Sequence, residues 1–392
     1  MPPYYDPIIG LPDYKLMSVR EYGEVEYQVE FVGNRTCPYC GGRRLRKKDT
    51  FLRRIKHQSR GIDRTYLLLK SHKFRCYSCA KYFNDRLPGI RPRFQSTEPF
   101  RDELAIKHHQ GVARSVSGRT SGVSSSTVER CYKAFLEQKD SHTKNAYCPK
   151  VLGIDEKHFT KKKGYMTTFC DLKRKKVFDV TLGRSEASLR SYLNHMAGRH
   201  QCRVLVMDLS ETFRGIGRKY FPNAMIVADR FHVVKLINHH FLKTWGELDE
   251  MGRKSRGLLS LMRRHPENLK PEQVPKLQRY LDQNPVIKAL YDFKQYLMRT
   301  VRVRVYSKHE ARTLIPDFLN CIALLKESPF KHMKTLGATL ESWQEEVVRM
   351  WRFSKTNSIT EGLHNRMEEI IRRAYGFRNF ENFRLRVKHY CS

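Results

Sequence analysis

Three acidic residues, each placed at the end or on the polar face of a regular segment, are of the type that holds divalent metal ions for phosphoryl transfer. Asp155 closes the apolar run Val-Leu-Gly-Ile, and Asp208 closes the run Val-Leu-Val-Met. Glu361 lies on the polar face of a helix predicted over 358–373. Hard Mg²⁺ prefers carboxylate oxygens and keeps several waters, which leaves room for phosphate oxygens. These residues therefore predict a metal-dependent nuclease site.

Neighbouring strands can bring such acids close enough to share ions. Adjacent strands lie about 4.8 Å apart, so carboxylates on two of them can flank two ions spaced about 3.5–4 Å. We expect two Mg²⁺ or Mn²⁺ ions, with Asp155 bridging both and with Asp208 and Glu361 each completing one shell. One ion would activate a water or a 3′-hydroxyl, and the other would stabilise the leaving oxygen.

Two of these acids also have a structural interpretation. A strand-terminal aspartate is often a turn former or a helix cap, and Asp208-Leu-Ser-Glu fits that pattern. Ser358-Ile-Thr-Glu361 matches a capping box, in which the glutamate bonds back to the cap amide. Against a cap alone, the polar face of that helix carries further polar groups, namely His364, Asn365 and Glu368.

Asp229 competes with Asp208 for the second aspartate position, because the run Met-Ile-Val-Ala-Asp also ends a predicted strand. If its strand lies beyond that of Asp208, Asp229 is about 10 Å from Asp155 and too far away to share a metal pair. Asp229 and the nearby His232 would then orient the site or contact DNA, and Asn365 is a further candidate for such a supporting role. An isolated histidine near a strand end is more often a structural group.

The segments that must position these acids follow the order β-β-β-α-β-α-β. Strands are predicted over 151–156, 165–171 and 177–182, a helix over 186–199, a strand over 203–207, a helix over 211–220 and a strand over 225–228. Three antiparallel strands followed by right-handed crossovers to parallel strands form the strand order of a ribonuclease-H-like core. Sites in sheets with parallel strands gather beyond the carboxyl ends of those strands.

The final helix of this α/β core comes late in the chain. Long basic helices are predicted first, at 258–264, 275–281, 288–298 and 330–351. We therefore expect a ribonuclease-H-like core, residues 150–234 and 353–392, that is interrupted by an all-α insertion over 235–352.

Residues 1–95 are predicted to form a small zinc-binding domain. Two CxxC motifs each offer two thiolates at a spacing that lets both reach one tetrahedral ion: Cys37 with Cys40, and Cys76 with Cys79. The 35 residues between the motifs exceed the usual spacing of about 15–20, which implies an inserted hairpin. Two alternatives remain open: unrelated pairs of buried thiols, or a site completed by His57 or His72.

Residues 96–145 are predicted to form a helix-turn-helix domain, with Gly122-Val-Ser as the turn and 124–135 as the recognition helix. That helix offers polar side chains to a major groove: Ser125, Ser126, Glu129, Arg130 and Lys133. An ordinary helical hairpin has a similar pattern. The polar segment 140–150, which contains Pro149, is a predicted linker.

The composition favours a polyanionic partner. In 392 residues, 75 Lys+Arg against 40 Asp+Glu give a formal charge of +35 and a pI near 9.9, which suits nucleic acid or an anionic membrane surface. No apolar run approaches the roughly 18 residues of a spanning helix, and the first residues lack the pattern of a signal peptide. We therefore expect no membrane partner and a cytoplasmic location. Ten cysteines fit a reducing compartment.

Taken together, these residues resemble the bacterial insertion-sequence transposases of the L3 family, which carry a DDE catalytic triad. The resemblance runs over nearly the whole chain, and its most specific stretches are 153–156, 221–233, 356–365 and 375–379. It implies the triad Asp155, Asp208 and Glu361, with a helical insertion before the glutamate. It also implies that the CxxC motifs and the helix-turn-helix bind DNA, close to the bacterial nucleoid.

The expected function is a DNA transposase that binds the terminal inverted repeats of its element and then cuts and rejoins DNA. Its partners would be double-stranded DNA, at element ends and target, and at least one further copy of the chain. Two other functions remain: a non-catalytic DNA-binding regulator, and a structure-selective nuclease. The intact acids argue against the first, and the N-terminal modules favour sequence-directed binding over the second.

Overall fold

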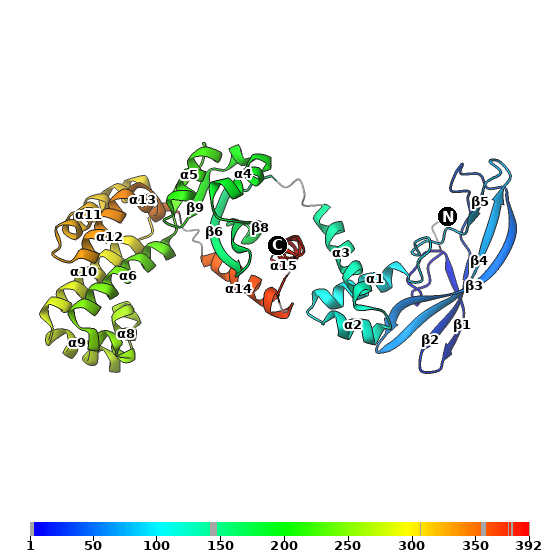
Figure 1. Ribbon diagram of the computed structural model, residues 1–392, viewed down its shortest axis with the longest axis horizontal. Helices are drawn as coiled ribbons and strands as arrows, with labels where there is room; N and C mark the ends of the chain where they lie inside the picture. The colour runs from blue at the N-terminus through cyan, green and yellow to red at the C-terminus, as the bar shows by residue number, and fades with distance from the viewer. Residues whose placement is uncertain are drawn as a thin grey trace. The chain divides into compact units, whose positions relative to one another are not determined.

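The structure is a computed structural model that describes residues 4–141, 147–305, 307–353, 358–374, 376–377 and 379–391. The chain divides into two compact units, residues 1–142 and 143–392, whose helices and strands are labelled in Figure 1. Each hydrophobic cluster among the described residues draws its members from a single unit. Each unit thus has a core of its own.

The first unit begins with a five-stranded sheet in the order β1-β2-β4-β3, with β5 paired to β4. The strands are β1 (Tyr14–Glu21), β2 (Val25–Phe31), β3 (Leu45–Arg60), β4 (Asp63–Cys76) and β5 (Tyr82–Asn84). β3 and β4 form a long antiparallel hairpin that turns at Gly61, where φ is +62°, a conformation that glycine adopts without strain. This hairpin fills the sequence between the two CxxC motifs, as the long spacing predicted.

Three helices complete the first unit: α1 (Glu98–His109), α2 (Arg114–Ser121) and α3 (Ser125–Ser141). The chain leaves α2 through Gly122, whose φ of +63° is left-handed. Val128 and Cys131 of α3 are buried against α1. The hairpin holds the end of α2, because Lys56 donates to the Gly122 carbonyl at 2.8 Å and Arg64 donates to the Thr120 carbonyl at 2.9 Å. Part of the predicted linker, residues 142–146, lies outside the described residues.

The second unit contains a five-stranded sheet in the order β10-β9-β6-β7-β8. β6 (Val151–Thr160), β7 (Gly164–Asp171) and β8 (Lys176–Leu182) are antiparallel, and β9 (Val204–Met207) and β10 (Met225–Ala228) run parallel to β6. The elements follow the predicted order β-β-β-α-β-α-β. β6 does not end near Glu156 as predicted, because its hairpin pairing with β7 continues to Thr160.

Helices cover both faces of this sheet. α4 (Glu186–His195) and α5 (Glu211–Tyr220) pack on one face through Leu189 and Phe213. The other face is covered by α6 (Arg230–Leu248), α14 (Ser358–Arg373) and α15 (Phe380–Tyr390), which contribute Val233, Leu363 and Phe383. Residues that alternate along a strand therefore enter two different cores.

The segment between α6 and α14 is helical: α7 (Glu250–Lys254), α8 (Arg256–Arg263), α9 (Val274–Asp282), α10 (Pro285–Arg302), α11 (Lys308–Glu327), α12 (Lys331–Ser342) and α13 (Gln344–Arg352), with two short 3₁₀ turns at Pro266–Asn268 and Pro271–Gln273. α6 is continuous across the predicted start of the insertion at residue 235. The single helix predicted over 330–351 is wrong. It breaks at Trp343, whose buried ring packs 3.5 Å from the Arg214 guanidinium, so a tertiary contact overrides the helical pattern.

No helix in the described part of the chain is both long and apolar enough to cross a bilayer.

Candidate active site and zinc site

Three aspartates lie in a row at one edge of the sheet in the second unit. The parallel pairing of β6 with β9 ends two residues before Asp155 and Asp208, and that of β9 with β10 ends one residue before Asp208 and Asp229. Continued by this register, the three aspartates stand at the same level of adjacent strands. Residues at one level of parallel strands point to the same face, which here is the face covered by α6 and α14.

His232 of α6 lies between two of these aspartates. Its Nε2 is 3.9 Å from Asp155 Oδ1 and 3.6 Å from Asp229 Oδ2, so these two oxygens cannot be farther apart than the sum of both distances. The separation of about 10 Å that strand spacing gave for Asp155 and Asp229 is therefore wrong for the side chains, which lean together past the strand between them. Asp229 also caps α6, since its Oδ1 accepts a hydrogen bond from the Phe231 amide at 3.4 Å.

α14 brings a second histidine to the site. His364 is buried, with its Nδ1 3.9 Å from Asp155 Oδ2 and its Nε2 3.0 Å from the Thr168 hydroxyl on β7. We expected His364 on the polar face of this helix, opposite its buried stripe, which is wrong. It lies one turn after the buried Thr360, and no sequence signal distinguished it from the exposed polar residues of this helix.

Glu361 is exposed one turn into α14. Burial lowers the pKa of His232, and the negative charges of Asp229 and Glu361 act in the opposite direction. The Glu361 charge thus acts on the His232 ring, which lies 3.9 Å from Asp155. The predicted capping box depends on the Ser358 side chain, which lies outside the described residues. Asn365 is exposed on the same helix.

The helix that carries Glu361 is attached to the central strand by ion pairing. Glu368 accepts from Lys157 of β6 at 2.6 Å, while Glu156, the neighbour of Asp155, points away and pairs with Arg184 at 3.3 Å. Neither the lysine nor the arginine of these pairs therefore neutralises the row of aspartates.

The electrostatics of the site favour binding of a cation. Burial, followed by the charge of Asp208, raises the pKa of Asp155 to about 7. Burial, followed by the charge of Glu156, raises the pKa of Asp208 to about 7. Burial also lowers the pKa of His364 to about 4, so this ring is neutral at pH 7. Among the described residues, the buried Asp208 Oδ1 has no hydrogen-bond partner. This set of oxygen donors fits a hard divalent ion such as Mg²⁺.

The four cysteines of the first unit form the tightest group of possible metal ligands in the described chain. Their sulfurs all lie within 4.8 Å of one another, with Cys37 Sγ 3.6 Å from Cys79 Sγ and Cys40 Sγ 3.6 Å from Cys76 Sγ. Tetrahedral zinc, with Zn–S bonds of about 2.3 Å, sets its sulfurs about 3.8 Å apart. The cluster therefore fits one zinc ion.

The two histidines considered as zinc ligands have other partners. His57 Nδ1 is 3.0 Å from the Thr97 hydroxyl, and His72 Nδ1 is 2.9 Å from the Thr50 hydroxyl. Neither belongs to the ligand group found in the described residues.

The predicted DNA-contacting side chains of α3 are all exposed: Ser125, Ser126, Glu129, Arg130 and Lys133. Arg130 donates to the Thr127 hydroxyl at 3.1 Å, and Lys133 lies 3.7 Å from Glu137. The helix thus presents a polar face opposite its buried one, which a recognition helix requires. An ordinary surface helix has the same property, so the role in DNA binding stays a prediction.

Comparison with known proteins covers the site and most of the chain. The family model DDE_Tnp_ISL3, described as a transposase, matches residues 152–387, a range that includes the row of aspartates and α14 but not the four cysteines. The transposase for insertion sequence element IS1001 from Bordetella parapertussis is 22% identical over an alignment of 366 residues, and the alignment covers 90% of this chain and 87% of that protein.

Proposed function

This chain belongs to the ISL3 family of insertion-sequence transposases, and from that premise we propose that it cuts and rejoins DNA with Asp155, Asp208 and Glu361. The observation that carries the proposal is the row of aspartates, two buried and one half-buried, beside the helix that bears the glutamate. Two of these aspartates have pKa values raised to about 7. A buried group of acids destabilises the fold unless a cation binds to it. An enzyme that transfers phosphoryl groups with bound metal ions would have such a cation at this site.

We assign the sheet of the second unit to a ribonuclease-H-like core, residues 150–234 and 353–392, with residues 235–352 as an all-α insertion. The order β8-β7-β6-β9-β10, with two parallel strands after an antiparallel meander, supports this assignment. The late position of α14, which packs beside β6 and β8, supports it too. The insertion would then separate Glu361 from the two aspartates in sequence but not in space.

In the proposed reaction, one site performs two in-line displacements. The oxygen of water bonds to phosphorus as the bond to the 3′-oxygen breaks, which leaves a 3′-hydroxyl and a 5′-phosphate; the proton of the water ends on the 3′-oxygen. The freed 3′-hydroxyl then attacks a target phosphodiester, and the displaced target oxygen takes its proton. Two bound Mg²⁺ or Mn²⁺ ions would polarise the phosphate and acidify the nucleophile. Asp155, Asp208 and Glu361 are the residues that would hold them.

The histidines and Asp229 act as positioning residues in this proposal. The His232 ring approaches both Asp155 and Asp229, and the neutral His364 ring is fixed by Thr168 with Nδ1 toward Asp155. Both rings would hold the Asp155 carboxylate in one orientation and exclude water from its inner side.

We assign recognition of the terminal inverted repeats to the first unit. Its zinc module (residues 1–95) would set the position of the helix-turn-helix (96–145), with Ser125, Ser126, Arg130 and Lys133 in a major groove. The net charge of +35 would add binding to DNA phosphates that depends strongly on salt. A dimer or larger assembly would pair two element ends in the bacterial cytoplasm.

A cleavage and joining assay with labelled element ends and Mg²⁺ or Mn²⁺ tests the proposal. We expect wild type to nick and join DNA, and Asp155→Asn, Asp208→Asn and Glu361→Gln to lose at least about 10³-fold in rate, since each removes several kcal/mol of charge stabilisation. Asp229→Asn should lose about 10–100-fold, as expected for a residue that orients a ligand.

Other outcomes would favour other functions. Loss of cleavage with Asp229→Asn but not with Asp208→Asn would reassign the second aspartate. Wild-type binding of element ends without any cleavage would support a DNA-binding regulator. Cleavage of branched DNA regardless of end sequence would support a structure-selective nuclease.

A further inference from the structure

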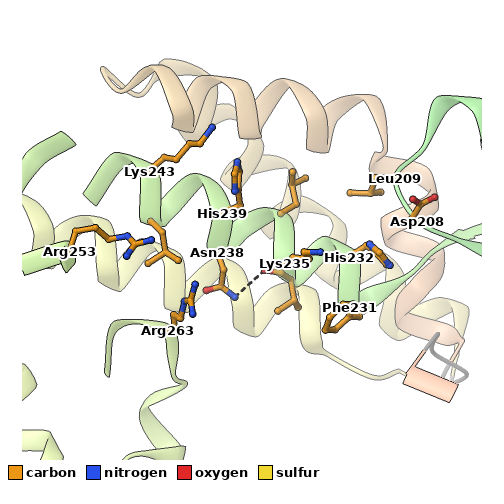
Figure 2. Close-up of a pocket in the computed structure, with 13 residues that line it drawn as sticks. Asp208, Leu209, Phe231, His232, Lys235, Asn238, His239, Lys243, Arg253 and Arg263 are labelled. Carbon is orange, nitrogen blue, oxygen red and sulfur yellow. Dashed lines mark hydrogen bonds between the residues drawn. The ribbon is translucent and has the colours of Figure 1, made fainter. Parts of the chain in front are cut away.

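A cavity of about 820 Å³ starts at Asp208 and His232 and follows α6 toward α7 and α8. Figure 2 shows the basic side chains that line it beyond the site. They come from three helices: Lys235, His239 and Lys243 from α6, Arg253 from α7 and Arg263 from α8. The cavity therefore connects the candidate active site to a group of cations, and we call it the α6 groove.

The basic side chains of the α6 groove are spaced regularly and form no ion pairs among the described residues. Lys235, His239 and Lys243 are four residues apart, so they share one face of α6 at intervals of about 6 Å. In the described chain, no carboxylate oxygen lies within 4.0 Å of a basic nitrogen of these three or of Arg253 and Arg263, whereas nearby cations of the insertion do form ion pairs, as Lys326 does with Glu341 at 2.7 Å. Unpaired cations in a row are a binding surface for phosphates.

The wall between these cations is apolar. Leu209, Val234, Leu236 and Leu242 line the groove, and Phe231 stands at its end near the site with 43% of its surface exposed. Bases in a duplex are stacked on one another and cannot use such a surface. A single strand can, because its base faces are free to stack on an aromatic ring while its phosphates follow the cations.

We propose that the α6 groove binds a single strand of DNA adjoining the phosphate that is cut, with phosphates along the row of cations and one base on Phe231. The choice of DNA as ligand rests on the proposed function. The groove would hold the strand in line with Asp155 and Asp208, so that the scissile phosphate stays at the site between the two displacements.

The test measures binding of a fluorescent oligothymidylate to the zinc-loaded full chain in buffer without Mg²⁺ or Mn²⁺, by anisotropy over a range of salt concentrations. The triple variant Lys235→Ala/Lys243→Ala/Arg263→Ala should lower the slope of log K against log salt by about 2, at about 0.7 per phosphate contact on a single strand. Phe231→Ala should weaken binding about 5–150-fold, which corresponds to the loss of one stacked base, and Phe231→Trp should bind as wild type does.

The matched control is Arg312→Ala/Lys331→Ala/Lys334→Ala, which removes three exposed cations of α11 and α12 that lie outside the groove. It should leave the slope unchanged. Equal effects of both triple variants, or an equal loss of duplex binding in the groove variant, would overturn the proposal. Because the assay contains no Mg²⁺ or Mn²⁺, its result is independent of catalysis. If the strand binds in the groove but wild type never cuts DNA with Mg²⁺, the result supports single-strand binding in the groove and refutes the proposed cleavage activity.

Discussion

The fold disfavours the charged forms of the Asp155 and Asp208 carboxyl groups. Burial and neighbouring acids both penalise their charged forms and raise both pKa values to about 7. The basic side chains nearest to Asp155 are imidazoles, and burial keeps the His364 ring neutral. No lysine or arginine forms an ion pair with Asp155 or Asp208 among the described residues, and a divalent cation would balance their charge.

The raised pKa of Asp155 predicts how the stability of the second unit depends on pH. A carboxyl whose pKa is raised from 3.8 to about 7 by folding stabilises the fold fully below pH 3.8 and loses that contribution as pH rises through 7. In metal-free protein at pH 8, Asp155→Asn should therefore raise the melting temperature of the second unit by several degrees, since three pKa units correspond to at most about 4 kcal/mol. Calorimetry at pH 5 and pH 8 measures this difference.

Magnesium is the control for this prediction. It should raise the melting temperature of wild type at pH 8 and have little effect on Asp155→Asn, whose site has lost a ligand. A variant that is less stable than wild type in metal-free buffer at pH 8 would contradict the electrostatic account.

The three aspartates that the structure places in a row could be picked out from sequence because each one follows an apolar run. The short distance between the Asp155 and Asp229 carboxylates could not be predicted, because strand spacing fixes the separation of the backbones and not the direction of the side chains. His364 was missed for a similar reason, since a polar residue one turn from a buried position can face the core when it has a partner such as Thr168.

At the scale of elements, Arg214 attaches the helical insertion to the core. This α5 residue donates to the Ser342 carbonyl at 2.8 Å, lies 3.3 Å from Glu346 and packs 3.5 Å from the Trp343 ring. Both charged side chains are almost fully buried. The ion pair thus forms where α12 ends and α13 begins.

Removing one partner of this buried pair should be costly. Arg214→Ala leaves the Glu346 charge buried alone and should lower the free energy of unfolding by about 3–5 kcal/mol. Arg218→Ala, on the exposed side of the same helix, should change it by less than about 0.5 kcal/mol. Urea denaturation measures both. Replacing both partners, as in Arg214→Met/Glu346→Leu, should recover most of the loss, and equal effects of Arg214→Ala and Arg218→Ala would refute the tethering role.

Segments with one strong period were predictable at this scale. The bounds of α5, β10 and α14 coincide with the predicted ranges, because their apolar residues recur at a single spacing between clear start and stop signals. The break at Trp343 was not predictable, since the helical pattern continues through it and only the contact with Arg214 interrupts the helix. Likewise, the start of the proposed insertion could not be located from sequence. The reason is that α6 packs on the sheet and continues without a break past residue 235.

At the scale of the whole molecule, the separate cores of the two units predict separate unfolding. Calorimetry should resolve two transitions, one of which depends on zinc. Cys40→Ser removes one of four thiolates and should lower only the transition of residues 1–142, because structural zinc contributes directly to folding free energy. Asp155→Asn should shift only the other transition. A single transition that moves as one with both variants would contradict this division.

The central claim is that Asp155, Asp208 and Glu361 bind the same metal ions, although Glu361 lies more than 150 residues after Asp208 in the sequence. Anomalous diffraction from crystals of the full chain grown with Mn²⁺ tests it most directly. The account predicts manganese peaks bound by oxygens of all three carboxylates, and loss of these peaks in Asp155→Asn. Manganese bound by Asp155 and Asp229 with Glu361 remote from it, or no manganese at this edge of the sheet, would contradict the account.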